Sequence, residues 1–182
     1  ELVMAHLTRP PVPPSHYEPT ISADFEQVVL RLMAKDPSER YASADEVAAA
    51  GMDYAYLSLH SSHEGLHDEL VGVEGAHRQS LEGIRNLARH PGVRITVNTV
   101  VVRRNMERLS AVVELLAAIP GVRIKFSYVE PRGAALNSVD EIPSPWEAAE
   151  AIRAALDQGQ DLGIRARMAW DGVPFCALRM WD

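Results

Sequence analysis

Cysteine is nearly absent from this sequence, since Cys176 is the only one in 182 residues. A single cysteine excludes a disulfide within the chain and fits a reducing environment. Long apolar runs are missing as well, because none approaches the roughly eighteen residues that a membrane-spanning helix needs. We therefore expect a cytoplasmic location and no membrane partner.

An excess of positive charge is also missing, because 18 lysines and arginines are outnumbered by 25 acidic residues and the net charge is −7. The basic residues form no stripe along the sequence, so we expect no nucleic-acid partner. Apolar residues make up 47% of the chain, which indicates a globular protein. The chain starts at Glu1 and stops just after a strand-like run, and both ends look cut.

Residues 1–50 are predicted to form a small all-α segment. Five closely spaced prolines predict an extended loop near its start. A helix capped by Ser22 should follow, because apolar residues recur there at helical spacing: Phe25, Val28, Val29, Leu32 and Met33. Ser43 with Glu46 three residues later predicts a second capped helix. Met4, Met33 and the aromatic positions fall at helical spacing and are interpreted as core.

From Gly51 onward the pattern changes to strands that alternate with helices. Strand-like segments rich in Val, Ile, Tyr and Thr lie at 54–60, 94–102, 122–130 and 164–170. Apolar stripes predict intervening helices around 81–88, 109–116 and 146–156. Ser144, Pro145 and Glu147 predict a capped start for the last of these helices. Single helices between strands imply right-handed crossovers and a parallel sheet. The predicted fold class is α/β, a partial parallel β/α barrel of about four strands over residues 51–182.

The run from Ala34 to Tyr41 reads Ala-Lys-Asp-Pro-Ser-Glu-Arg-Tyr and lies between the two capped helices. Together with the proline-rich loop, it makes residues 1–50 resemble the C-terminal tail of a bacterial serine/threonine protein kinase domain. The resemblance implies that Arg40 is a structural residue whose glutamate partner is not among these residues. A buried unpaired guanidinium is costly, so Arg40 should turn outward or cap the chain locally. No ATP-binding or catalytic kinase motif is present, and we expect no phosphoryl transfer.

The second part of the chain contains an ordered set of segments: Tyr56-Leu57-Ser58-Leu59-His60, Leu66-His67-Asp68, Val97-Asn98-Thr99-Val100-Val101, Asn105 and Phe126 to Gly133. In this order they resemble the C-terminal half of a radical S-adenosylmethionine (SAM) enzyme. The resemblance implies the fourth to sixth β/α units of a partial barrel. It also implies a parent activity, in which a [4Fe–4S] cluster cleaves SAM reductively and the resulting radical abstracts hydrogen from a substrate.

The cysteines that hold such a cluster are absent, because the CxxxCxxC motif of that family does not occur here. Cys176 resembles the point where some members begin to bind an auxiliary cluster. One cysteine cannot hold a cluster, so Cys176 is interpreted as a small buried apolar residue. SAM and the [4Fe–4S] cluster are thus cofactors of the parent family, and we expect this chain to bind neither. Whether the chain is an enzyme stays open.

The resemblance implies cofactor-binding positions at the carboxyl ends of the strands, where β/α folds bind ligands: Ser58, Asn98, Asn105, Val129, Glu130 and Pro131. The first three match positions that approach SAM, and the last three match backbone that passes its adenine. Alternatives remain, since Ser58 could be a packing residue and Asn105 a helix cap. Asn98 lies in an apolar strand, and an unpaired amide there would cost about 1–3 kcal/mol, so a dedicated partner is expected.

Three histidines invite a metal interpretation, namely His60, His63 and His67. They are predicted to lie in a loop with few carboxylates nearby, and we interpret them as polar surface residues. No catalytic residue and no metal ligand is assigned.

Three functional hypotheses follow. The first is a radical SAM-related half barrel that is inactive as it stands, and the second is a kinase-derived docking or regulatory fragment. The third is a fragment without function. A half barrel should expose a free strand edge at Tyr54 and a hydrophobic sheet face, so self-association or pairing with a missing first half of the barrel is expected.

Overall fold

The computed structural model describes residue 4 and residues 8–129 and 133–169. The chain divides into two compact units, Glu1–Met52 and Asp53–Asp182, each with its own internal contacts. Across the described ranges, no helix combines the length and the apolar character that crossing a membrane requires.

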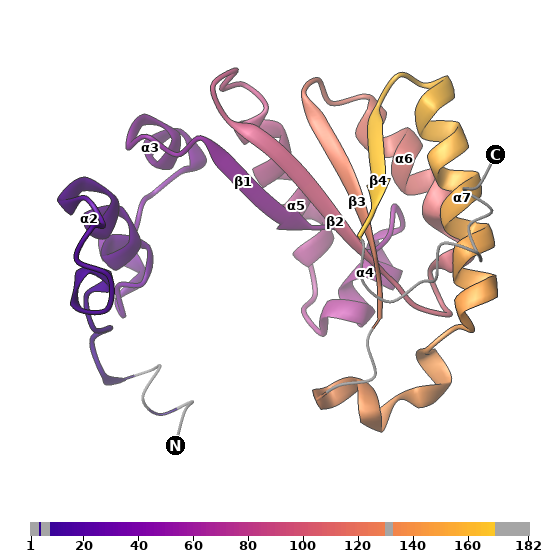
Figure 1. Ribbon diagram of the computed structural model, residues 1–182, viewed down its shortest axis with the longest axis horizontal. Helices are drawn as coiled ribbons and strands as arrows, with labels where there is room; N and C mark the ends of the chain where they lie inside the picture. Colours follow the sequence, from indigo (N-terminus) through magenta and orange to yellow (C-terminus); the bar gives the residue numbers. More distant parts are fainter. Residues whose placement is uncertain (1–3, 5–7, 130–132, 170–182) are drawn as a thin grey trace. The chain divides into compact units, whose positions relative to one another are not determined.

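The first unit consists of short helices joined by loops (Figure 1). Its described elements are η1 (Pro14–His16), α2 (Ala23–Leu32), η2 (Pro37–Glu39) and α3 (Ala44–Ala49). Both predicted caps are confirmed, because the Ser22 hydroxyl accepts a hydrogen bond from the Phe25 amide and the Ser43 hydroxyl accepts one from the Glu46 amide. These bonds satisfy amide groups that have no partner within the helix.

The core predicted for this first unit is wrong. Phe25 is 56% exposed, Met33 is 43% exposed and Met4 is 60% exposed. No residue of the unit whose exposure is described is buried. Amphipathic spacing identifies the apolar face of α2 correctly, but a few short helices have too little surface to enclose that face.

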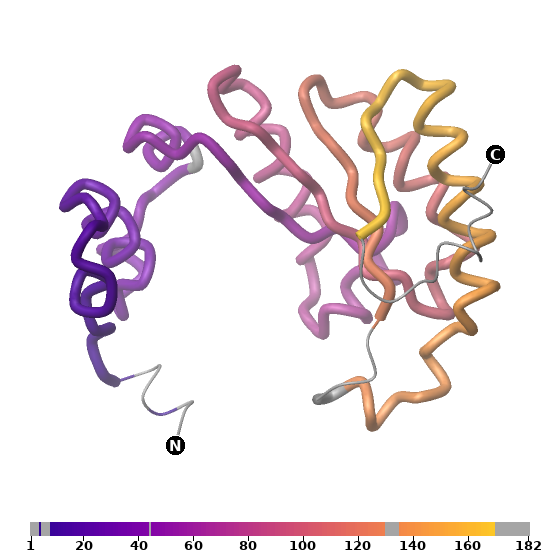
Figure 2. Tube along the Cα trace, in the orientation of Figure 1, coloured from indigo at the N-terminus to yellow at the C-terminus, as the bar shows by residue number. Residues whose placement is uncertain are grey.

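The second unit is built around a four-stranded sheet with strands in the order β1-β2-β3-β4. The strands are β1 (Tyr54–Ser58), β2 (Arg94–Val101), β3 (Val122–Tyr128) and β4 (Arg165–Met168), and all neighbours pair in parallel. The predicted parallel α/β architecture is confirmed in this coarse form, and it is consistent with part of a β/α barrel. Figure 2 shows the four strands side by side in chain order.

Helices connect these strands. They are α4 (Glu64–Val71), α5 (Ala76–Leu87), α6 (Leu109–Ala117) and α7 (Pro145–Asp161), with short 3-10 turns η3 (Met106–Arg108), η4 (Gly133–Asn137) and η5 (Val139–Glu141). Helices α5, α6 and α7 pack along one side of the sheet (Figure 1). The predicted start of α7 is confirmed: the Ser144 hydroxyl accepts from the Glu147 amide, and the Glu147 carboxylate accepts from the Ser144 amide.

The hydrophobic core lies between the sheet and these helices. Alternate residues of the strands, and Leu59 just after β1, point into it, and all are at most 8% exposed: Ala55, Leu59, Ile95, Val97, Val101, Val122, Ile124 and Phe126. Each of the three helices contributes an apolar stripe, with Ile84 on α5, Val113 on α6 and Ile152 on α7. Helix α7 approaches β4 closely at Gly159, where a Cβ atom would lie 3.0 Å from that of Ala166. The period of two along the strands therefore gives the sheet one covered face.

The opposite face of the sheet differs from the expectation. Its strand positions include Tyr54, Tyr56, Arg123, Arg165 and Arg167, and all five are exposed. The prediction of an open face is correct within the described residues, but the prediction that this face is hydrophobic is wrong. Long cationic and aromatic side chains replace the apolar ones, so exposure of this face to water costs less than expected.

Candidate ligand site at the carboxyl ends of the strands

The candidate ligand site begins with Ser58 and Asn98, which lie side by side on the open face. They are paired in register across β1 and β2. Ser58 is exposed and its hydroxyl makes no hydrogen bond among the described residues. Ser58 is therefore not a buried packing residue, and its hydroxyl is available to a ligand.

Asn98 has the dedicated partner that its sequence context predicts. Its side-chain oxygen accepts a hydrogen bond of 2.8 Å from the Ser127 hydroxyl of β3. The residue is 7% exposed, and no bond of its amide nitrogen is found in the described part of the chain. The Ser127 bond orients the amide, and the nitrogen is left as a donor next to Ser58.

Asn105 occupies a different place, beneath the loops that follow β1 and β2. Its amide nitrogen donates to the carbonyl oxygens of His60 and Val100, both at 2.8 Å, and its oxygen accepts from the Val102 amide at 2.9 Å. It is 1% exposed. Asn105 is the N-cap residue of η3, as the alternative interpretation expected, but its side chain makes no capping hydrogen bond to that helix. All of its donors and its oxygen serve the backbone, and these contacts give no support to its predicted role as a ligand contact.

Two of the three histidines interpreted as surface residues lie inside this region, and that interpretation is wrong for them. His67 is 1% exposed, on α4, and His60 is half-buried after β1. The His60 amide donates to His67 Nδ1 at 3.0 Å, and the Val100 amide donates to His60 Nδ1 at 3.3 Å. His63 alone fits its prediction, since it is exposed and caps α4 by accepting from the Leu66 amide.

The histidines form a contact chain with His77 of α5. The rings of His60 and His67 stack with centroids 5.7 Å apart, and His77 meets His67 edge-on at 5.6 Å. Burial, reinforced by the charges of His60 and His77, lowers the pKa of His67 to about 4. Burial also lowers the pKa of His60. An Nδ1 that accepts an amide hydrogen bond requires the neutral imidazole, which agrees with both shifts.

Asp68 ties this histidine chain to the start of α5. Its carboxylate accepts from the Gly75 amide at 2.6 Å and from the His77 amide at 2.8 Å. The hydrogen bond from the His77 amide is the largest cause of the lowered pKa of Asp68. The Nε2 atom of His77 is buried and has no partner among the described residues. Asp68 thus satisfies helix amides and is not a free base.

Metal-binding geometry does not emerge from these groups, because no cluster of three or more metal-binding side chains occurs within the described ranges. The other predicted positions are less informative. Val129 is half-buried just after β3, whereas Glu130, Pro131 and Cys176 lie outside the described residues. Arg40 is exposed as predicted, and its Nε donates to the Ala34 carbonyl oxygen at 2.9 Å.

The residues present do not fit a [4Fe–4S] cluster. Such a cluster requires three thiolates in the family that the sequence resembles, and these 182 residues contain one cysteine. The fit to SAM is better, because Ser58 and Asn98 offer neutral donors and acceptors at the strand ends. Hydroxyl and amide groups suit the ribose hydroxyls and the carboxylate of SAM.

Sequence reasoning missed the histidine chain and the helix that carries it. Helix α4 has only eight residues and ends at Val71, just before the C-cap Gly72, so its periodicity is too short to distinguish it from a loop. One signal in the sequence could have indicated this helix. His63 is a possible N-cap, and Leu66 follows it three residues later as a first apolar residue of the helix. The contact of His67 with His77 joins two helices, and the spacing of residues within either helix does not predict it.

Comparison with known proteins finds two kinds of relatives, although no family model matches the chain. The chain is 27% identical over 135 residues to the PqqA peptide cyclase of Bradyrhizobium diazoefficiens, which covers 74% of this chain and 35% of that protein. It is 29% identical over 109 residues to the AdoMet-dependent heme synthase of Nitratidesulfovibrio vulgaris, covering 60% and 29%.

The second kind of relative is a kinase. A segment of 41 residues is 54% identical to the serine/threonine-protein kinase Pkn1 of Myxococcus xanthus, and it covers 22% of this chain and 6% of that protein. The chain therefore spans about a third of the length of its cyclase and synthase relatives and a small part of the kinase. The resemblance to radical SAM enzymes and the shorter resemblance to a kinase are both confirmed.

Proposed function

We propose that residues 53–182 are the part of a radical SAM-type fold that contacts SAM from one side and does not hold its cluster. This proposal departs from the sequence-based expectation that the chain binds no SAM. The observation that carries this proposal is the pair Ser58 and Asn98 on the open face, where Ser58 is the last residue of β1 at the carboxyl edge of the sheet and Asn98 is its partner in register on β2. Ligands of β/α folds bind at that edge. Relatives named for AdoMet dependence support the choice of ligand.

The chemistry of the site limits what these residues do. The Ser58 hydroxyl and the Asn98 amide nitrogen are neutral hydrogen-bonding groups, so they orient a ligand and do not transfer a proton at neutral pH. The buried, neutral imidazole of His67 supports the loop after β1 through the His60 amide. These roles are those of a binding surface, and reductive cleavage would require thiolates from other residues.

The contact with SAM is tested by NMR titration of the chain with millimolar SAM. We expect weak binding, with shifts concentrated at Ser58 and Asn98, and Ser58→Ala should weaken it about threefold because one neutral hydrogen bond is lost. Asn137→Ala, an exposed position in η4, is the matched control and should leave binding unchanged. An absence of shifts at the strand ends contradicts the proposed contact.

The proposed lack of cleavage is tested separately, by anaerobic reconstitution with iron and sulfide. We expect far fewer than the roughly four irons per chain of a [4Fe–4S] protein, and no 5′-deoxyadenosine from SAM after reduction. Four irons together with SAM cleavage would overturn the proposal that these residues are inactive.

A second candidate function rests on the identity of 54% with a kinase segment. We propose that the first unit is a docking module for a kinase lobe. Its surface offers the exposed Phe25 of α2 and the exposed Met33 that follows this helix. The Arg31 guanidinium lies 4.1 Å from the centre of the Tyr41 ring. Binding of a kinase lobe that persists after deletion of residues 51–182 supports this function, and a negative pull-down with the full chain removes it.

A further inference from the structure

The open face of the sheet carries an unusual concentration of positive charge. Its strand positions alternate with the buried ones, and five of them are basic: Arg94, Arg123, Lys125, Arg165 and Arg167. None of the strand positions on this face is acidic. The chain as a whole has a net charge of −7, so this clustering is opposite to the overall composition.

Like charges lie directly opposite each other on this face. Arg123 is in register with Arg165, and Lys125 is in register with Arg167. Directly opposed like charges destabilise a sheet, so this arrangement works against folding unless an anion neutralises it. Within the described residues, no ion pair is found for Arg123, Arg165 or Arg167.

The remaining two cations are only weakly compensated. Arg94 pairs with Asp53 at 3.3 Å, but the Asp53 side chain is 80% exposed, so water screens that pair. The Lys125 ammonium lies 5.6 Å from the centre of the Tyr56 ring. The ring adds a face that attracts a cation but carries no net charge. Among the residues that the structure describes, the positive charge of the face is therefore largely unbalanced.

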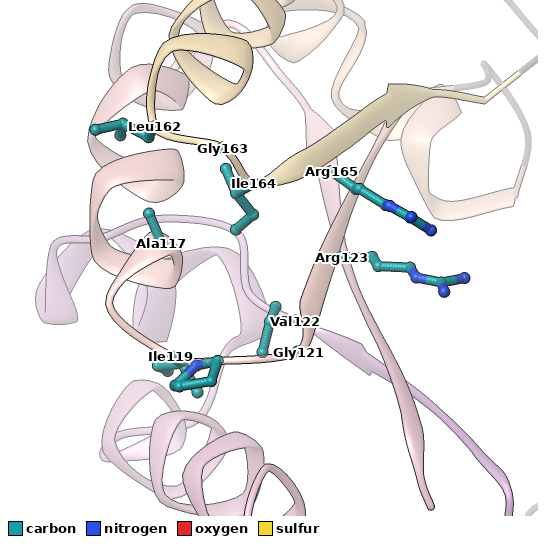
Figure 3. A pocket seen from close by; sticks show the side chains of 10 residues that line it. Ala117, Ile119, Gly121, Val122, Arg123, Leu162, Gly163, Ile164 and Arg165 are labelled. Atoms are coloured by element: carbon teal, nitrogen blue, oxygen red, sulfur yellow. The ribbon is translucent and has the colours of Figure 1, made fainter. Parts of the chain in front are cut away.

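A hollow of about 310 Å³ lies within this face. It is lined by Tyr54, Arg94, Thr96, Arg123, Ile124, Arg165, Ala166 and Arg167. A second hollow of about 400 Å³ lies at the amino ends of β3 and β4, and Arg123 and Arg165 belong to both. Figure 3 shows these two side chains extending from neighbouring strands toward the same side. Two guanidinium groups thus extend on the same side of the sheet, from residues that line both hollows.

We propose that this hollow binds a small molecule that carries two or more phosphate or carboxylate groups. Guanidinium groups match the oxygen atoms of phosphates and carboxylates in pairs, and several of them can hold two anionic groups at once. The volume of the hollow is at the lower end of small-molecule sites. The proposal does not rest on the SAM contact, because Arg123 and Arg165 lie about 7 Å farther from the carboxyl ends than Asn98.

A small ligand fits this surface better than a nucleic acid or an acidic protein. The cations lie on three neighbouring strands, β2, β3 and β4, a width of about 10 Å, and no basic stripe continues beyond them in the sequence. A long polyanion would also meet the net negative charge of the rest of the chain. Guanidinium groups bind phosphates and carboxylates alike, so the experiment below compares one ligand of each kind.

The test is isothermal titration of the full chain with pyrophosphate and with citrate, at constant ionic strength, with sulfate as a simple dianion. We expect pyrophosphate or citrate to bind at least tenfold more tightly than sulfate, and the tighter of the two identifies the ligand class. The variant Arg123→Gln with Arg165→Gln should weaken that binding about tenfold or more, since charge-assisted hydrogen bonds are lost. Arg85→Gln, at an exposed arginine of α5 on the covered side of the sheet, is the matched control and should bind as the wild type does.

A melting curve without ligand gives an independent readout. Removal of one of two opposed like charges should leave the melting temperature of Arg123→Gln unchanged or raise it. The proposal would be overturned if sulfate bound as tightly as pyrophosphate and citrate, or if the double variant bound as the wild type does. It would also be overturned if an acidic peptide or single-stranded DNA bound tightly while pyrophosphate and citrate did not bind. Loss of SAM-induced shifts at Ser58 with intact anion binding would remove only the function proposed above.

Discussion

At the scale of single residues, Asn105 holds the strand-end loops together by three hydrogen bonds. It joins the His60 carbonyl after β1 to the Val100 carbonyl and the Val102 amide of the neighbouring segment. An asparagine supplies two donors and one acceptor, which matches this need completely. The polar character of the residue was recognisable in the sequence, but its partners are distant in the chain and only folding brings them together.

We expect Asn105→Ala to lower the free energy of unfolding by about 2–4 kcal/mol, because three partly buried backbone groups lose their hydrogen bonds to its side chain. Urea unfolding followed by circular dichroism measures this change. Asn137→Ala, at an exposed position, should change it by less than about 0.5 kcal/mol. A loss for Asn105→Ala that is no larger than for this control would show that the network is not stabilising.

His67 makes stability depend on pH. Burial lowers the pKa of its imidazole from 6.5 to about 4 in the folded chain. The unfolded chain therefore binds a proton below pH 6.5 that the folded chain refuses, and stability is lost as the pH falls from about 6.5 to about 4. We expect the free energy of unfolding to fall by up to about 3 kcal/mol across this window, as measured by urea unfolding at each pH.

His67→Asn is the variant that tests this assignment. Its side-chain oxygen can replace Nδ1 as the acceptor for the His60 amide, and it does not titrate. The pH dependence between 6.5 and 4 should become shallower, with the part due to His60 remaining. The pKa of Asp68 is lowered from its ordinary value of 3.8, so this carboxyl group changes the stability only at pH values below the window. An unchanged slope would contradict the role of His67.

At the scale of secondary structure, local capping determined the helix starts. Ser22, Ser43 and Ser144 were predicted as caps, and each hydroxyl accepts a helix amide hydrogen bond. Capping depends on residues three positions apart, so it survives without tertiary information. Helix α4 was missed for the opposite reason, because a short helix depends on packing for its stability.

The capping box of α7 supplies a prediction for this scale. Ser144→Ala should lower the free energy of unfolding by about 1 kcal/mol, since the Glu147 amide loses its acceptor. Ser138→Ala is a matched control, because Ser138 also precedes a helical turn but forms no capping hydrogen bond. Thermal unfolding of both variants checks the difference. Equal melting temperatures would mean that the cap adds nothing to stability.

At the scale of the whole molecule, the second unit leaves a strand edge open. Strand β1 ends the described sheet, and Tyr54 and Tyr56 on it are 42% and 48% exposed. Unpaired edges attract further strands. We therefore expect self-association, which static light scattering at rising concentration measures as a mass above that of one chain.

Tyr56→Lys tests whether this edge is responsible. A lysine on an edge strand opposes pairing with a second strand, so the variant should associate less than the wild type. Tyr17→Lys, at a residue of the first unit that is 75% exposed, is the matched control and should associate as before. A wild-type chain that stays monomeric at high concentration would contradict the expected self-association.

The amino-acid sequence alone determined the order of the elements, the parallel sheet, the helix caps and the partner need of Asn98, because these follow from local spacing and from the period of two or 3.6 residues. Tertiary structure decided which polar groups meet. Helix packing brings together the histidine chain of His60, His67 and His77. Strand register places Arg123 opposite Arg165. Register joins residues about forty positions apart, and no local pattern records such a contact.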